Sequence, residues 1–338
     1  MRVKIEDVAR EADVSTATVS LALNGSDKVN AQTRVRVNAV AKRMGYRPNP
    51  SAKRLAMRKS RQIGLVIPDI ENQYYAGLAQ YILNELQAGD YALSISSSMN
   101  SRQMERRIVS DMIDNQVEGL LIAPVEKPNE NVEYLDLLNA AGIPFLFVTA
   151  SYPNLNHPCV MCDLYDGMYR LLDSLYARGY SRFAMLSGAQ NVHCFDLRDR
   201  AFLDYMRARG LKSGAIHHLD GVRYDHAYQF ARNMDAEGLD AVVCVNDMMA
   251  LGVINALIER GLSIPEDIAV AGFDDSIFSR VSSISITTVR QDIHQMAVQA
   301  AERIISLAQG EAPARQEPPL IPCEVIMRRS TGSRAALR

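Results

Sequence analysis

Residues that could carry catalytic chemistry are scarce in this chain of 338 residues. The sequence contains no G-x-G-x-x-G, no P-loop and no G-x-S-x-G pattern, which are the usual signatures of nucleotide cofactors and of hydrolase nucleophiles. We therefore predict no catalytic residue, no cofactor and no enzymatic activity.

One pair of cysteines has a spacing that is found in metal sites. Cys159 and Cys162 form a Cys-x-x-Cys pattern, with His157 and His193 as the further ligands that zinc would need. We interpret the stretch as a strand, in which an offset of three residues points the two thiols to opposite faces. We predict a structural role for both cysteines and no metal site.

Polar and aromatic residues that follow apolar runs are the candidates for binding a ligand. These residues are Tyr74, Tyr75, Ser97, Ser98, Asn246, Asp247 and Asp274. They fall in loops after predicted strands, which is where doubly wound sheets bind ligands. Two alternatives remain open, namely core packing for the two tyrosines and a loop cap for Asp274.

The apolar runs themselves predict the architecture of most of the chain. Short runs alternate with amphipathic stretches of helix length, which is typical of parallel sheets covered by helices. One series comprises residues 63–67, 92–95, 119–123 and 144–148, and a second comprises residues 183–186, 216–219, 241–245 and 268–272. We predict an α/β body of two doubly wound parallel-sheet lobes whose carboxyl edges face a shared cleft.

Charge divides the chain into a basic head and an acidic body. Residues 1–61 carry 14 Lys and Arg against 5 Asp and Glu, a formal charge of +9, and the other residues carry 23 against 34, or −11. Such a head predicts a polyanionic partner, the alternative being a solvated basic face. Because we find neither a secretory signal nor an apolar run of membrane-spanning length, we expect a cytoplasmic protein without a membrane partner.

The head has the helical pattern of a DNA-binding unit. Apolar residues recur at helical spacing in residues 5–12 and 16–23, and Ser15 is a suitable N-cap for the second helix. A third helix is predicted for residues 31–44. Two short helices with a third in support form a helix-turn-helix, although any three-helix unit gives a similar pattern.

Residues 46–58 join the head to the body. Pro48 and Pro50 favour an extended chain, after which a short helix can begin. Because two turns of helix are marginal in water, we interpret the segment as a hinge helix that forms when a second copy or a DNA groove packs against it. A basic interdomain linker is the alternative.

Four segments together resemble the lactose/galactose repressor family of transcriptional regulators. They are residues 14–25 (VSTATVSLALNG), 46–55 (YRPNPSAKRL), 272–275 (GFDD) and 287–291 (TTVRQ). The resemblance extends over nearly the whole chain. It implies that the second helix enters the DNA major groove and that the hinge helix enters the minor groove.

The DNA-binding candidates in the head and hinge are Lys4, Ser15, Thr16, Ala17, Thr18, Leu21, Asn24, Lys53, Arg54 and Leu55. Thr16 can bond a base or a phosphate, whereas Ala17 and Leu21 offer apolar contact, for instance to a thymine methyl. Leu21 stands where the family often has a polar or basic residue, and Lys4 stands where it usually has a capping threonine. The resemblance implies that Leu55 is an apolar wedge in the minor groove.

For the body, the resemblance implies a likeness to sugar-binding periplasmic receptors, with crossovers near Val160 and Arg290. Arg198 matches the effector-binding arginine of the family, and Asp274 matches its cleft aspartate. An arginine, an aspartate and aromatic rings suit a polyhydroxylated, carbohydrate-like effector. The aspartate that often follows the fourth strand in the family is replaced here by Thr149-Ala-Ser. The effector-binding candidates are Tyr74, Tyr75, Ser97, Arg198, Asn246 and Asp274.

We predict a helix-turn-helix domain at residues 1–47, a hinge helix and linker at 48–61, and a two-lobed body for effector binding and dimerisation at 62–338. The lobes are expected at about 62–160 with 291–320, and at about 161–290 with 321–330.

The function that these features predict is transcriptional regulation, with repression as the simplest form. We expect a homodimer that binds a near-palindromic, double-stranded operator and responds to a small effector bound between the lobes. A solute-binding receptor without a gene-regulatory role and an enzyme on the same scaffold are the alternatives.

Overall fold

The computed structural model describes residues 3–46, 60–125, 132–152, 157–212, 214–311 and 319–332. The chain comprises two compact units, Met1–Ser60 and Arg61–Arg338, which we call the head and the body. The predicted hinge helix, with Lys53, Arg54 and Leu55, lies outside the described residues.

Three short helices build the head, namely α1 (Ile5–Glu11), α2 (Thr16–Leu23) and α3 (Ala31–Arg43). Helix α2 begins after Ser15 because the Ser15 hydroxyl accepts a hydrogen bond from the Thr18 amide at 3.1 Å. The apolar faces of the three helices meet around Val8, Val19 and Val37, which are fully buried. The predicted helical head is confirmed.

The first lobe of the body contains a parallel sheet in the order β2-β1-β3-β4-β5. Its strands are β1 (Gln62–Ile67), β2 (Ala92–Ser97), β3 (Gly119–Ile122), β4 (Phe145–Val148) and β5 (Cys159–Val160). Its helices are α5 (Gln73–Ala88), α6 (Arg102–Asp114), α7 (Tyr134–Ala141) and α13 (Ile293–Ala308).

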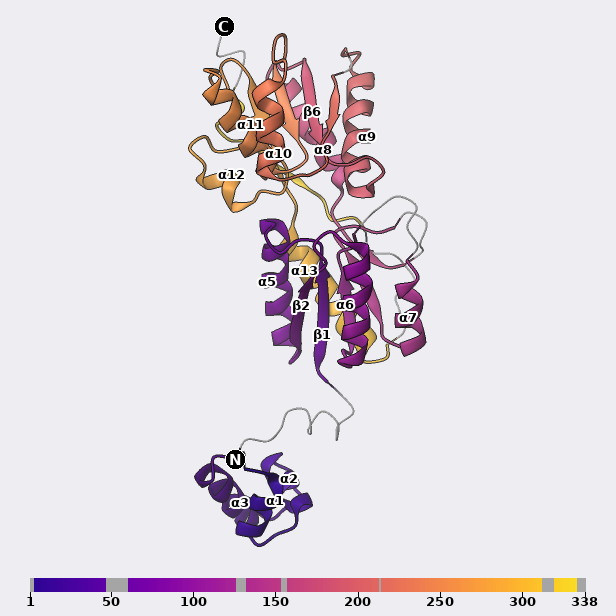
Figure 1. The fold of residues 1–338 in the computed structure, drawn as a ribbon, viewed down its shortest axis with the longest axis vertical. Helices are drawn as coiled ribbons and strands as arrows, with labels where there is room; N and C mark the ends of the chain where they lie inside the picture. The colour runs from indigo at the N-terminus through magenta and orange to yellow at the C-terminus, as the bar shows by residue number, and fades with distance from the viewer. Residues whose placement is uncertain are drawn as a thin grey trace. The chain divides into compact units, whose positions relative to one another are not determined.

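Helices cover both faces of this first sheet, α5 and α13 on one side and α6 and α7 on the other (Figure 1). Strand β1 packs against both helix layers, because alternate side chains of a strand point to opposite faces of the sheet. Ile63 and Leu65 pack with α5 and α13, whereas Val66 packs with α6 and α7. A strand covered on both faces appears in the sequence as a continuous apolar run. The position of β1 could therefore be predicted from the sequence.

The second lobe contains a parallel sheet in the order β7-β6-β8-β9. Its strands are β6 (Phe183–Ser187), β7 (Ile216–His218), β8 (Ala241–Cys244) and β9 (Ala269–Ala271). Its helices are α8 (Leu164–Tyr176), α9 (His193–Ala208), α10 (Tyr224–Asn233), α11 (Asp247–Glu259) and α12 (Ile277–Val281), and they are grouped around this sheet in Figure 1. The predicted body of two parallel-sheet lobes is confirmed.

The chain crosses between the lobes near Val160 and Arg290, where the resemblance implied it. It enters α8 after β5, returns through β10 (Thr288–Arg290) to α13, and reaches the second lobe again at β11 (Glu324–Ile326). Strands β10 and β11 pair antiparallel, with Arg290 opposite Glu324.

Both parallel sheets reverse their strand order beside their first strand. Strand β1 lies between β2 and β3, and β6 lies between β7 and β8. The loops on the two sides of such a point diverge and leave room at the carboxyl edge, where doubly wound sheets bind ligands. Tyr74 follows β1 and Asn246 follows β8, so both candidates lie at these points.

Candidate functional site

The outward face of α2 is the candidate DNA-binding surface of the head. Thr16, Ala17 and Leu21 are exposed, and Leu21 leaves 37% of its surface accessible. Val19 and Ala22 are buried in the head core instead. Exposed side chains therefore recur along one side of α2, as base contact by a recognition helix requires.

Three further candidates on α2 or at its ends make local hydrogen bonds. The hydroxyls of Ser15 and Thr18 lie 2.8 Å apart, and the side-chain amide of Asn24 donates to the carbonyl of Ser20 at 2.9 Å. These bonds fix both ends of α2. Ser20 is also exposed on the outward side of the helix, and we had not singled it out from the sequence.

Lys4 occupies the N-cap position of α1 without acting as a side-chain cap. A lysine side chain has only donors and so cannot accept a bond from the first turn. The carboxylate of Asp7 accepts a hydrogen bond from the Lys4 backbone N–H at 3.0 Å instead. One half of a capping box is thus present, while the Lys4 ammonium is left for other partners.

In the body, Arg198 on α9 is buried beside Asp274. Its side chain is 7% exposed, and its Nη2 lies 3.8 Å from Oδ1 of Asp274. The guanidinium carbon lies 4.2 Å from the ring centroid of Phe273, so the cation stacks on that ring. Its Nε has no hydrogen-bond partner among the described residues, and Nη1 reaches only the Cys194 carbonyl at 3.4 Å. A buried guanidinium with so few acceptors has donors available for a ligand.

Asp274 is linked to the first lobe through Gln291. The Gln291 side-chain amide donates to Oδ1 of Asp274 at 2.8 Å, and its Oε1 accepts from the Tyr74 hydroxyl at 3.0 Å. Because Tyr74 belongs to α5 and Asp274 follows β9, this polar chain spans the two lobes. Asp274 also has a φ of 105°, a conformation that costs free energy and is concentrated at functional sites.

Burial dominates the electrostatics of this site. Burial raises the pKa of Asp274 to about 6, while Arg198 and the hydrogen bond from Gln291 act in the opposite direction. Burial, and then the charge of Asp274, raise the pKa of Asp247 to about 8, although Asp247 accepts a hydrogen bond from the Thr288 hydroxyl at 2.6 Å. Near pH 7 the site therefore holds one carboxylate, one mostly protonated carboxyl and one guanidinium, which nearly balance in charge.

The other effector candidates lie nearby but use polar groups in structural bonds. The ring of Tyr75 packs edge-on against Tyr74, with centroids 5.3 Å apart. Asn246 caps α11, and its amide donates to the Val222 carbonyl at 2.8 Å. The Ser97 hydroxyl donates to a carbonyl in the loop after β1 at 3.4 Å. The structure thus connects Tyr74, Arg198 and Asp274 through a chain of contacts. Tyr75, Asn246 and Ser97 lie beside this chain.

Gln291 and Phe273 are the site residues that the sequence did not indicate. Gln291 lies in the TTVRQ segment and Phe273 in GFDD, so both belong to the segments that carry the resemblance. No role in the site was predicted for either residue. Their positions in the site depend on partners such as Tyr74, which is 217 residues away from Gln291. No local pattern reports a contact at that separation.

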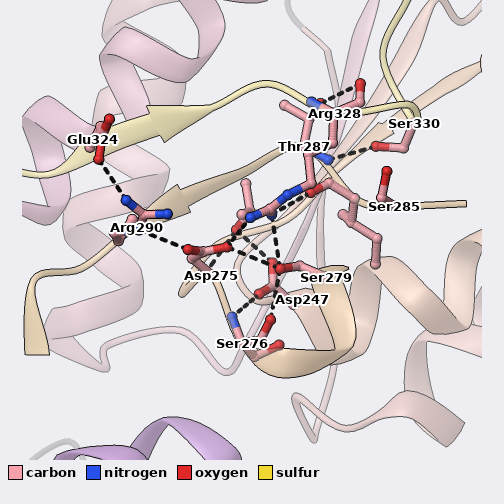
Figure 2. Close-up of polar contacts among 12 residues, drawn as sticks. Asp247, Asp275, Ser276, Ser279, Ser285, Thr287, Arg290, Glu324, Arg328 and Ser330 are labelled. Atoms are coloured by element: carbon pink, nitrogen blue, oxygen red, sulfur yellow. Dashed lines mark hydrogen bonds and ion pairs between the residues drawn. The ribbon is translucent and has the colours of Figure 1, made fainter. Parts of the chain in front are cut away.

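An ionic cluster beside Asp274 fastens β10 and β11 to the second lobe (Figure 2). Asp275 accepts from Arg328 at 2.5 Å and from Arg290 at 2.7 Å, and Arg290 also reaches Glu324 at 2.9 Å. Burial acts to raise the pKa of Asp275, but the hydrogen bonds and charges of the two arginines hold that pKa below its ordinary value. This cluster therefore fixes the crossover that carries Gln291.

The two cysteines of the Cys-x-x-Cys pattern lie at and just beyond the last strand of the first sheet. Cys159 lies on β5, and its thiol donates to the Ala150 carbonyl at 3.3 Å, whereas Cys162 is fully buried beyond the end of that strand. Within the described part of the chain, no group of three or more His, Cys, Asp or Glu side chains could hold a metal ion.

Two protein-family models match the chain. Residues 4–49 match the lacI family of bacterial regulatory proteins, and residues 172–331 match a periplasmic binding protein-like domain. The chain therefore carries a lacI-family DNA-binding domain together with a periplasmic binding protein-like domain. The first matched segment lies in the helical head, and the second covers the part of the body from within α8 onward.

Named relatives of this lacI-family chain are transcriptional regulators. Catabolite control protein A of Priestia megaterium is 28% identical over 335 residues, which cover 98% of this chain and 100% of that protein. The protein of the same name from Staphylococcus aureus is 28% identical over 297 residues, covering 88% and 89%. A solved structure of the Lac repressor dimer bound to operator and the anti-inducer ONPF matches with a TM-score of 0.85 and 26% identity, over 98% and 99% of the two chains.

This lacI-family chain is a DNA-binding transcriptional regulator, as the sequence predicted. The alternative of a receptor without a gene-regulatory role is not favoured, because the DNA-binding part of the family matches at residues 4–49. The family consists of regulators and not of enzymes. Within the described segments, no helix is both long and apolar enough to span a membrane.

Proposed function

We propose that this lacI-family regulator is a repressor whose operator binding is controlled by an uncharged, polyhydroxylated small molecule held around Arg198 and Asp274. The observation that carries the proposal is the buried Arg198 guanidinium. It stacks on Phe273, faces Asp274, and has an Nε without a hydrogen-bond partner among the described residues. A cation buried in this way is costly unless an additional acceptor satisfies it, and a bound ligand can supply that acceptor.

The class of effector follows from the charge and shape of the same residues. The guanidinium of Arg198 and the carboxylate of Asp274 nearly cancel, so a charged ligand would add an uncompensated charge to a buried site. Hydroxyl groups can both donate to Asp274 and accept from Arg198. The ring of Tyr75, which is only partly buried, offers an apolar face to a C–H surface. A sugar or a sugar derivative has this combination of groups.

The polar chain of Asp274, Gln291 and Tyr74 supports coupling between the effector and the DNA-binding function. A ligand that bonds Asp274 changes the partner of Gln291, and Gln291 holds Tyr74 of the first lobe. A ligand shifts a conformational equilibrium only through its differential affinity for the two states. These residues can distinguish the states because their bonds cross the lobes.

The proposal for the DNA side places α2 in the major groove and the segment at 48–61 in the minor groove. The exposed side chains of Thr16, Ala17 and Leu21 would face base edges. Lys4, Lys53 and Arg54 would neutralise phosphates, which makes binding depend steeply on salt. Leu55 would provide the apolar wedge.

We further propose that the repressor acts as a homodimer in the cytoplasm, without catalysis. Strand β2 is an edge strand that exposes Ile95, and Tyr81 on α5 is exposed nearby in sequence. In the second lobe, Ile277 and Val281 on α12 are also exposed. A strand edge can pair with a second chain, and exposed apolar side chains can pack against one. The Lac repressor, which this chain resembles, was solved as a dimer bound to operator.

A gel-shift assay with the full-length protein tests the proposal. The DNA is the promoter region upstream of the protein's own gene and of its neighbours, and the additives are neutral sugars, polyols, sugar acids and sugar phosphates. We expect specific binding that one neutral compound alters at a concentration where its acid and phosphate counterparts do not. Specific binding that responds only to charged compounds would contradict the effector class, and absence of specific binding would contradict the repressor.

A further inference from the structure

Arg223 joins the two lobes of the body through a pair of acidic residues. It precedes α10 in the second lobe, and its Nη2 and Nη1 donate to Asp69 at 2.6 Å and to Glu71 at 2.8 Å. Asp69 and Glu71 lie in the loop after β1 of the first lobe. We call these three residues the clasp.

The clasp adjoins the candidate effector site in both lobes. In the first lobe, its acidic residues immediately precede α5, which carries Tyr74. In the second lobe, the Val222 carbonyl next to Arg223 accepts a hydrogen bond from the side chain of Asn246 at 2.8 Å. The acidic residues of the clasp follow β1, the strand at which the first sheet reverses its strand order. The arginine is connected, through the neighbouring Val222 carbonyl, to the corresponding point of the second sheet.

The polar side chains of the candidate site are almost closed to solvent with the lobes in this arrangement. The side chains of Arg198 and Asp274 are 7% and 12% exposed, and Tyr74 and Gln291 are buried. A ligand that bonds these groups cannot reach them from outside without movement of the protein. The lobes must therefore separate before a ligand can enter or leave.

We propose that the clasp is the gate of the candidate effector site: it holds the lobes together at the edge of the site, and its release admits the effector. The statement about the effector rests on the proposed function. The statement that the clasp restrains the opening of the lobes concerns the protein without any ligand, and it can be tested on that protein alone.

The ionic character of the clasp suits a gate. The Arg223 side chain is about half exposed and Glu71 is mostly exposed, so this pair lies in a region of high dielectric, while Asp69 is 17% exposed and its pair is only partly solvated. Exposed pairs of this kind contribute little and are screened by salt, so the closed arrangement is favoured only modestly and can open readily. The buried chain from Tyr74 to Asp274 also links the lobes and should respond much less to salt.

Hydrogen–deuterium exchange of the full-length, ligand-free protein tests the gate. Arg223→Gln removes the charge but keeps a polar side chain, and we expect the amides of residues 72–76, 220–224 and 272–276 to exchange about threefold to tenfold faster, which matches one or two weak ion pairs. NaCl at about 1 M should accelerate the same amides in the wild type and leave the variant nearly unchanged.

Two further variants separate a gate from a general loss of stability. Arg209→Gln is the matched control, because Arg209 makes a similarly exposed pair with Asp173 at 2.5 Å within the second lobe. It should not accelerate exchange at 72–76. The exchanged pair Arg223→Glu with Asp69→Arg, made together with Glu71→Gln so that no like charges face each other, restores one attraction and should return exchange to within about twofold of the Glu71→Gln protein.

Unchanged exchange in Arg223→Gln, equal acceleration in Arg209→Gln, or no recovery in the exchanged pair would each overturn the gate. These measurements are made without any sugar, so their outcome does not bear on the proposed effector class. The gel-shift assay tests that class. If a neutral effector is found by gel shift, Arg223→Gln should speed both its association and its dissociation, because a gate lowers both rates. A change confined to dissociation would mean that Arg223 contacts the effector itself and would overturn the gate.

Discussion

The side-chain amide of Gln291 donates to Oδ1 of Asp274 at 2.8 Å, which places a neutral residue between a buried carboxyl and the first lobe. Its carbonyl oxygen accepts from the Tyr74 hydroxyl, so both polar ends of the side chain are occupied. Removing Gln291 would leave two buried groups without this partner. A buried polar group without a hydrogen-bond partner lowers the free energy of unfolding by about 1 to 3 kcal/mol.

Gln291→Leu should therefore lower the free energy of unfolding by about 2 kcal/mol. Tyr74→Phe removes only a hydroxyl, and together the two substitutions should cost about 1 kcal/mol less than the sum of the single effects. Denaturant unfolding of the four proteins measures this coupling. Gln295→Leu, at an exposed position of α13 shortly after Gln291, is the control and should change little. Strictly additive losses would show that the two side chains are not coupled.

Arg198→Met should weaken effector binding while leaving operator binding intact in the absence of effector. The methionine keeps apolar contact with Phe273 but removes the donors, and each charge-assisted hydrogen bond contributes about 1.5 to 3 kcal/mol. A loss of at least about tenfold in affinity is expected. Calorimetric titration measures it once the gel-shift panel has named a compound. Arg200→Met provides the control, because Arg200 is exposed on the same helix. Equal affinity in both variants would remove Arg198 from the site.

The stability of the body should fall as the pH rises from about 5 to about 9, with a contribution from Asp247. The folded-state pKa of this carboxyl is about 8, above its ordinary value, so the folded protein holds a proton that the unfolded chain has released. Stability is lost through this window, by about 1.4 kcal/mol for each unit by which the pKa is raised. In Asp247→Asn the midpoint of thermal unfolding should depend less on pH there. Identical pH profiles for the two proteins would mean that Asp247 is ionised throughout.

The main elements of the fold could be predicted because their causes are local. Strand β1 is an unbroken apolar run, since helices cover both of its faces, and α2 begins at a serine that caps it. Strands β10 and β11 were not predicted, although β10 lies within the TTVRQ segment. Each of the two strands contains a charged residue, Arg290 or Glu324, so neither stands out as an apolar run, and an ionic cluster fastens them.

The candidate site could be predicted only in part. Arg198 and Asp274 were indicated by resemblance, and the position of Tyr74 after a strand followed from the alternation of elements. Gln291 and the clasp arginine Arg223 were not indicated, because each acts through partners more than 150 residues away. Contacts of that kind depend on how the lobes pack and leave no trace in the spacing of residues.

Asp275→Asn should destabilise the body by about 3 kcal/mol at pH 7, because it leaves the partly buried Arg328 without its carboxylate partner. The pKa of Asp275 is below its ordinary value, so its contribution is full above the unfolded pKa near 4 and is lost as the pH falls through the folded pKa. The difference from wild type should thus shrink on acidification. Thermal unfolding at several pH values measures it, with the exposed Glu266→Gln as control. A difference that does not shrink at all as the pH is lowered below about 4 would argue against an ionic origin.

Leu55→Ala should reduce operator affinity and DNA bending while leaving effector binding unchanged. An apolar wedge that unstacks a base step costs a few kcal/mol and allows a bent duplex to contact more protein, so a smaller side chain loses part of that contact. Fluorescence energy transfer between the two ends of an operator duplex measures the bend. The comparison is Leu21→Ala on the outward face of α2, which should change base preference without straightening the duplex, because a major-groove contact does not unstack bases. Equal bending by the wild type and Leu55→Ala, at saturating protein, would contradict the wedge.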